Sequence, residues 1–190
     1  MRQLSSHAIV LRTIDYGESD RIVSLYTKDF GRIRVIAKGA KRSRKRFGSS
    51  LELFTHNEVF FVDRETRGLA RLDRCHIINA YHEIAEDIRR VVFGNYVLEL
   101  ADTLTAEREK HPEIFSLLLF FIGLLSGEGF REEILRLFEL RLFSLLGYRP
   151  QFLQCVACGG QFHIRHSYRF SVKRGGIVCP GCQQQFSDLL

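Results

Sequence analysis

The sequence contains no Trp and no long apolar run. Its most apolar stretch, residues 114–125, has 12 residues, whereas a membrane-spanning helix needs about 20. We therefore expect a buried core helix there and no membrane contact. The apolar stretch at residues 8–11 is too short for the core of a secretory signal peptide, so we expect a cytoplasmic protein. Without Trp, the 16 Phe residues must fill much of the core.

The sequence also lacks the common catalytic motifs. It has no phosphate-cradling G-x-x-x-x-G-K-[ST], no H-E-x-x-H and no G-x-S-x-G. We therefore predict that the protein is not an enzyme. A chain of 190 residues with 45% hydrophobic residues is nevertheless long enough to bury a real core.

Three regions differ in their apolar pattern. Residues 1–79 contain short β-rich runs, at 8–14, 21–27, 32–37, 51–54 with 58–63, and 69–78, with turns at Asp29-Phe30-Gly31 and Arg67-Gly68. These runs predict a small closed five-stranded barrel. Residues 80–150 have a helical period. Pro112 is placed to begin a second helix, Gly127 and Gly129 to end it, and Gly147 to end a third.

Residues 151–190 have no long apolar period, but they contain two C-x-x-C pairs. In a reducing compartment such pairs favour metal binding over disulfides, and their separation is typical of zinc ribbons. We predict one structural Zn²⁺ site with four thiolate ligands, Cys155, Cys158, Cys179 and Cys182. The fifth cysteine, Cys75, is interpreted as a small buried residue.

Three other interpretations of the metal chemistry are weighed against this one. A catalytic zinc needs an open coordination position, which four thiolates do not leave. His56 and Glu58 with a later C-x-x-C faintly resemble a zinc deaminase signature, but Val178 stands where that signature has Pro. His163 and His166 are alternative ligands, and we expect them on the loop surface instead.

Positive charge is concentrated in one segment. Residues 32–46 carry eight cations and no acid, whereas the whole chain has a net charge of +6. Such a segment favours contact with a polyanion, because cationic grooves follow nucleic-acid backbones and aromatic rings stack on bases. The predicted nucleic-acid contacts are Arg32, Arg34, Lys38, Lys41, Arg42, Arg44, Lys45, Arg46 and Phe47.

Simpler interpretations of this segment stay open. Charged runs of this kind are also common in solvated surface loops without a ligand, and Phe47 is as suited to core packing as to stacking. The zinc ribbon is a weaker candidate for the main nucleic-acid surface, because four thiolates and one divalent cation leave a charge of −2 that offsets its basic residues.

The opening AIVLRTIDYGESDRIVSLYTKDFGRIRVIAKGAKRSRKRFGSSLELF, the stretch LFSLLGYRPQFLQCVACGG and the knuckle GGIVCPGC together resemble the RecO family of bacterial recombination mediators. The resemblance covers nearly the whole chain in order. It implies an α+β multidomain protein with an N-terminal five-stranded OB-fold barrel (residues 1–79), an α-helical domain (80–150) and a C-terminal four-cysteine zinc ribbon (151–190).

The resemblance also implies a function. Family members bind single- and double-stranded DNA, anneal complementary strands and help to load the RecA recombinase onto DNA coated by single-strand binding protein (SSB), with RecR as co-mediator. This activity belongs to double-strand break and gap repair in the RecF pathway, in the cytoplasm and near the nucleoid. The SSB tail and RecR are the implied protein partners, and the basic loop matches the DNA-binding loop of the family.

One departure from the family pattern concerns the end of the chain. Family members usually continue into further helices after the ribbon, whereas this sequence stops at Leu190. We therefore expect an exposed apolar face in the helical domain. Two other functions are compatible with the composition: an RNA-binding OB and zinc module, and a non-catalytic protein-interaction scaffold.

Overall fold

A computed structural model describes residues 2–42, 46–63, 68–128 and 130–190. Its contacts divide the chain into two compact units, Met1–Phe138 and Glu139–Leu190. The finer division at residues 79 and 150 stays a prediction. The elements are β1 (Arg2–Tyr16), β2 (Asp20–Thr27), β3 (Gly31–Ala37), β4 (His56–Asp63), β5 (Ala70–Asn79), η1 (His82–Glu86), α1 (Ile88–Leu104), α2 (Pro112–Ser126), α3 (Glu133–Leu145), β6 (Arg169–Ser171), β7 (Gly176–Val178) and η2 (Pro180–Gln185).

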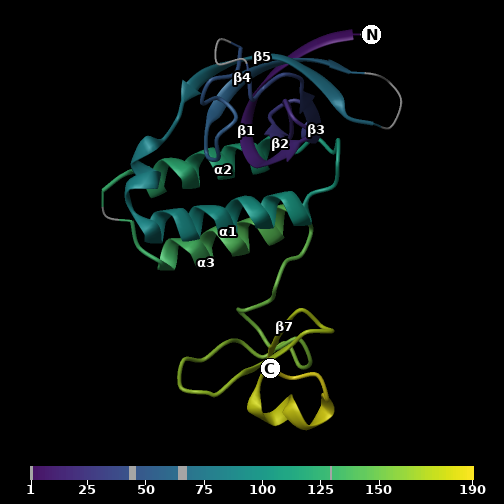
Figure 1. Ribbon diagram of the computed structural model, residues 1–190. Helices are drawn as coiled ribbons and strands as arrows, with labels where there is room; N and C mark the ends of the chain where they lie inside the picture. The colour runs from purple at the N-terminus through teal and green to yellow at the C-terminus, as the bar shows by residue number, and fades with distance from the viewer. Residues whose placement is uncertain (1, 43–45, 64–67, 129) are drawn as a thin grey trace. The chain divides into compact units, whose positions relative to one another are not determined.

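The N-terminal strands close into a barrel in the order β1-β2-β3-β5-β4. Neighbouring strands are antiparallel except β3 and β5, which pair in parallel. The predicted five-stranded barrel is confirmed, and five strands in a Greek-key barrel are typical of OB folds. Alternating apolar residues such as Val23, Leu25, Ile33 and Val35 fill the interior. Figure 1 shows the barrel with the helices of its unit beside it.

One predicted strand is confirmed only in part, since β4 covers residues 58–63 but not 51–54. Residues 51–54 form turns instead of joining the strand at 58–63. Phe54 has φ +68°, a left-handed conformation that ends extended structure. Its ring lies directly over Gly94 of α1, where a Cβ atom would collide with it. Leu51 is buried in the barrel core, so the segment closes the barrel without pairing. The expected turn at Arg67-Gly68 includes Arg67, which lies outside the described residues.

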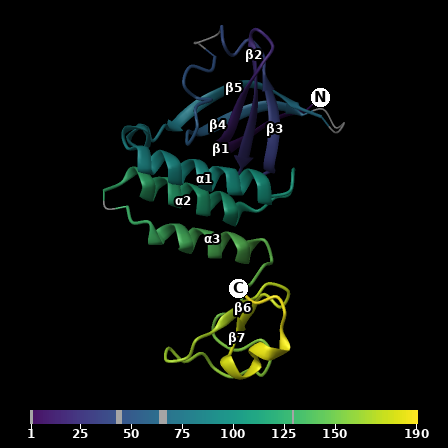
Figure 2. The same cartoon turned by 60° about the horizontal axis from the view of Figure 1, so that its bottom comes forward.

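The helices α1 and α2 run side by side along the barrel (Figures 1 and 2). The Asp87 carboxylate accepts a hydrogen bond from the Arg89 N–H and caps α1. Pro112 begins α2, as predicted. The apolar run at 114–125 is the core helix expected, since six of its side chains are buried: Ile114, Phe115, Leu118, Phe121, Ile122 and Leu125. Within the described part of the chain, no helix is both long and apolar enough to cross a membrane.

Within the first unit, α3 packs through Phe138, whose ring centroid lies 5.0 Å from that of Phe121. Gly147 has φ +89° just after α3 and ends it as predicted. Gly129, the other predicted helix breaker, lies outside the described residues. Phe120 and Leu137 are 65% and 67% exposed, so α2 and α3 each present an apolar side chain to water.

The second unit has little core of its own. Strands β6 and β7 form an antiparallel pair, and residues 151–190 bury only three apolar side chains, Cys155, Ile177 and Val178. So few buried side chains cannot offset the entropy of ordering about forty residues. The cysteines must supply the missing stabilisation.

Candidate metal centre and nucleic-acid interface

The four cysteines of the two C-x-x-C pairs meet in the second unit. Their Sγ atoms all lie within 4.8 Å of one another, and those of Cys158 and Cys179 are 3.8 Å apart. A tetrahedral zinc site with bonds of about 2.3 Å has its sulfur atoms about 3.8 Å apart. The cluster therefore has the dimensions of a four-thiolate metal site. Its members are Cys155, Cys158, Cys179 and Cys182.

The thiols of this cluster have unequal acidities. Burial acts to raise the pKa of Cys155, but backbone N–H groups, first that of Cys179, lower it to about 6. The pKa of Cys182 is raised to about 12, first by its hydrogen bond with Cys179 and then by burial. Only a cation would hold all four thiols deprotonated together. His163 and His166 lie outside the cluster and pack against each other, as the sequence predicted for loop-surface residues.

On the barrel, Arg32 and Arg34 share the outer face of β3. The Arg32 Nε donates to the Thr105 carbonyl at 3.0 Å, and its Nη1 lies 3.6 Å from the Asp102 carboxylate. The Arg34 Nη2 lies 3.4 Å from the Glu107 carboxylate. With its side chain only 17% exposed, Arg32 anchors the end of α1 to the barrel.

The loop after β3 faces the turn between β1 and β2. The Lys41 Nζ lies 2.9 Å from the Asp15 carboxylate and donates to the Gly17 carbonyl at 3.1 Å. Its hydrogen bond lowers the pKa of Asp15. The Arg42 Nη2 lies 3.7 Å from the Glu18 carboxylate. Exposed pairs of this kind are weak because water and salt screen them, so a phosphate can replace the carboxylate.

The base of this loop is fixed by Asp20. Its carboxylate accepts a hydrogen bond from the Gly39 N–H at 2.8 Å, which lowers the pKa of Asp20. Lys38 is exposed and lies near enough to contribute to that lowering. Arg44 and Lys45, also predicted to contact nucleic acid, lie outside the described residues.

Arg46 and Phe47 have structural contacts. The Arg46 guanidinium donates to the Asp73 carbonyl at 2.9 and 3.3 Å and to the Lys38 carbonyl at 3.4 Å. It also lies 4.7 Å from the centroid of the Phe47 ring. Phe47 is 3% exposed and belongs to the barrel core. Of its two interpretations, core packing is the one found, and its ring is not offered to a base.

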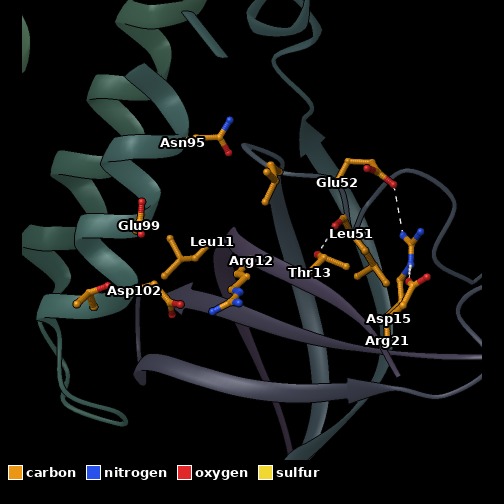
Figure 3. Close-up of a pocket in the computed structure, with 12 residues that line it drawn as sticks. Leu11, Arg12, Thr13, Asp15, Arg21, Leu51, Glu52, Asn95, Glu99 and Asp102 are labelled. Atoms are coloured by element: carbon orange, nitrogen blue, oxygen red, sulfur yellow. Dashed lines mark hydrogen bonds and ion pairs between the residues drawn. The ribbon is translucent and has the colours of Figure 1, made fainter. Parts of the chain in front are cut away.

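A cavity of about 580 Å³ lies between β1, the 51–53 turns and α1. Figure 3 shows side chains from all three converging on it. Arg21 crosses one side, within 3.2 Å of Asp15 and 3.4 Å of Glu52. The four carboxylates that line the cavity repel phosphate and outnumber its two cations, Arg12 and Arg21. The cavity is therefore unsuited to a nucleic-acid backbone. The carboxylates are those of Asp15, Glu52, Glu99 and Asp102.

Comparison with known proteins covers nearly the whole chain. The family model "Recombination protein O N terminal" matches residues 1–81, and "Recombination protein O C terminal" matches residues 85–188. The chain belongs to the RecO family. The resemblance inferred from the sequence is therefore confirmed.

Individual RecO relatives agree with this assignment. The chain is 35% identical to the DNA repair protein RecO of Syntrophus aciditrophicus, over 93% of this chain and 68% of that protein. It is 37% identical to the protein of the same name from Pelobacter propionicus, over 96% and 73% of the two chains. The corresponding protein of Halalkalibacterium halodurans is 34% identical over 93% and 68%.

Sequence reasoning missed one part of this RecO barrel, the segment of residues 105–111. The Arg108 N–H donates to the Arg32 carbonyl at 2.8 Å, and its guanidinium binds both Asp63 oxygens at 2.6 and 2.9 Å. The Glu109 carbonyl sits where a Cβ of Gly31 would be. The segment is charged and has no apolar period, so nothing in its sequence predicts pairing with β3.

Proposed function

We propose that this chain is a DNA-binding recombination mediator of the RecF pathway. It binds single- and double-stranded DNA, anneals complementary strands and helps to load RecA onto SSB-coated single strands, with RecR and the SSB tail as partners. It acts in the cytoplasm, at the nucleoid. Family membership supports this proposal, and the observation that carries it is the exposed basic loop at the end of β3.

The contacts within the barrel reduce the number of residues that we propose to contact DNA. Arg32 is tied to the helical segment, and Phe47 to the core. We therefore assign the DNA contact to the loop of residues 38–46 that follows β3, with Arg34 of β3 at its border. The loop residues are Lys38, Lys41, Arg42, Arg44, Lys45 and Arg46.

Annealing by such a loop needs no covalent step. Cations that neutralise the phosphates of two mutually repelling strands release counterions, and base pairing then drives the reaction. Because the proposed activity needs no covalent step, we propose that the chain is not an enzyme. The four cysteines then hold a structural Zn²⁺, since four thiolates complete its tetrahedron and leave no position for a reacting water.

The salt dependence of single-strand binding tests the loop. The variant carries Lys41→Gln, Arg42→Gln, Arg44→Gln, Lys45→Gln and Arg46→Gln. We expect its slope of log K against log [salt] to be flatter by roughly 0.7 for each phosphate that the variant no longer neutralises. Fluorescence anisotropy with a labelled oligonucleotide measures both slopes. A version that retains Arg46 covers the possibility that removing its hydrogen bonds to carbonyl groups unfolds the loop.

A matched control removes the same number of exposed cations elsewhere in the first unit, by Gln substitution of Lys28, Arg71, Arg89, Lys110 and Arg131. It should leave most of the slope in place. An unchanged slope in the loop variant would show that DNA binds elsewhere. Annealing of SSB-coated strands and competition with RNA of the same sequence then separate the mediator from a general nucleic-acid binder.

A further inference from the structure

The ribbon carries a chain of aromatic rings that the metal site does not use. The Phe162 and Tyr168 ring centroids lie 5.0 Å apart at 36°. His166 lies 6.3 Å from Tyr168 at 37°, and His163 lies 5.7 Å from His166. We call residues 162–169 the aromatic loop. Four rings from one short segment therefore form a continuous cluster.

Backbone contacts give this loop a defined shape. The Tyr168 hydroxyl accepts a hydrogen bond from the His163 N–H at 3.0 Å and donates one to the Gln161 carbonyl at 3.3 Å. The Phe162 N–H donates to the Leu153 carbonyl at 2.8 Å. The loop backbone and the Tyr168 ring are thus arranged in advance, which lowers the entropy that a ligand must offset on binding.

The aromatic loop lies open to water. Phe162 is 47% exposed and Ile164 is 90% exposed. His163 and His166 are exposed as well, and Tyr168 is half-buried. These side chains contribute no core to the ribbon, and exposed apolar surface in such a small unit indicates a binding site.

The charge around the rings is positive. Arg165 and Arg169 belong to the loop, and neither pairs with an acidic side chain among the described residues. Residues 151–190 contain one acidic side chain, Asp188. It is occupied by the Ser171 hydroxyl and the Lys173 N–H. Exposed rings beside unpaired guanidinium groups favour a ligand that is both flat and anionic.

We propose that the aromatic loop is a second contact for single-stranded DNA, which stacks bases on Phe162 and its neighbouring rings. Every base has a π face, so stacking tolerates any sequence. A duplex keeps its bases inside, so the loop binds single strands in preference to duplexes. The inference rests on the proposed DNA-binding function and deepens it, because it gives the ribbon a role in telling the two forms apart.

The test uses the full chain with its metal bound and a labelled 30-nucleotide oligo(dT). The double substitution Phe162→Ala and His166→Ala should weaken single-strand binding roughly 5- to 30-fold. The salt slope and the duplex affinity should not change, because rings release no counterions. Phe152→Ala is the matched control, since Phe152 is 44% exposed and also packs on one ring, that of Phe170.

A second variant reports stacking directly. The chain has no Trp, so Phe162→Trp introduces the single indole, and Phe152→Trp is its control. Oligo(dT) should quench the fluorescence of the Phe162→Trp protein, whereas an abasic oligonucleotide with the same phosphates should not. Equal quenching by both, or none by either, would overturn the proposal.

Failure of the inference is distinguishable from failure of the proposed function. If the unmodified chain binds oligo(dT) with a steep salt slope and the loop variants bind equally well, only the stacking role is wrong. If the unmodified chain does not bind oligo(dT), the proposed function fails first. If the aromatic-loop variants lose binding to an acidic peptide but bind DNA as the unmodified chain does, the stacking role is overturned in favour of a protein partner.

Discussion

The two basic regions of the molecule differ in what their cations already bind. In the barrel, Lys41 and Arg42 face carboxylates, and Arg46 donates to backbone carbonyls. In the ribbon, Arg165 and Arg169 have no acidic partner among the described residues. If both regions contact DNA as proposed, the barrel exchanges its own acids for phosphates, whereas the ribbon needs no such exchange.

The regions also differ in what holds them folded. The barrel buries a continuous apolar core, whereas the apolar side chains that the ribbon buries are Ile177, Val178 and Cys155, the last a member of its cysteine cluster. A surface presented by the barrel thus depends on packing. With the proposed metal bound by the four cysteines, a surface presented by the ribbon depends on that metal, so its removal should affect the two regions very differently.

The largest expected effect comes from Cys158→Ser. Loss of one thiolate should release the metal and unfold residues 151–190 while the first unit stays folded, because metal binding supplies folding free energy of order ~10 kcal/mol in small zinc modules. Metal analysis and hydrogen exchange measure the two outcomes. Cys75→Ser is the control, since Cys75 lies on β5, outside the cluster. Retained metal and unchanged exchange in the ribbon would contradict the metal assignment.

The next effect concerns the contact between β3 and residues 105–111. Gly31→Ala places a methyl group against the Glu109 carbonyl at φ +63°, so it should lower the free energy of unfolding by at least about 3 kcal/mol. Gly17→Ala has a similar φ of +58° but open space around it, and should cost about 1 kcal/mol. Urea denaturation measures both. Equal losses of unfolding free energy in the two variants would show that packing of residues 105–111 against β3 does not stabilise the barrel.

The smallest effect tests the exchange of acids for phosphates. Asp15→Asn together with Glu18→Gln removes the carboxylates that face Lys41 and Arg42. Single-strand affinity should rise roughly two- to fivefold, since exposed pairs are weak. Anisotropy at fixed salt measures the change, and Asp73→Asn is a control away from these two cations. Unchanged or weaker binding would mean that these carboxylates do not compete with DNA.

Much of the fold could be predicted because its signals are local. Alternating apolar residues mark the strands, Pro112 and Gly147 mark helix ends, and two C-x-x-C pairs bring their thiols together. The 51–54 segment could not, because its conformation depends on the approach of Phe54 to Gly94, a residue distant in the sequence.

The candidate site was predicted less completely than the fold. The sequence marks the positive charges, but it does not show which are already engaged. Arg32 meets Thr105, which is 73 positions away, and such partners become neighbours only in the folded barrel. Phe47 follows the basic run directly, yet the closure of the barrel turns its ring inward.

The outer face of β2 has a consequence for the autonomy of the barrel. Ser24 donates to the Asp102 carboxylate, and Tyr26, fully buried, reaches the His111 carbonyl. This face of β2 is buried inside the first unit. A barrel cut after Asn79 would expose that face to water, so anyone who transplants the barrel into another protein must bring residues 80–111 with it.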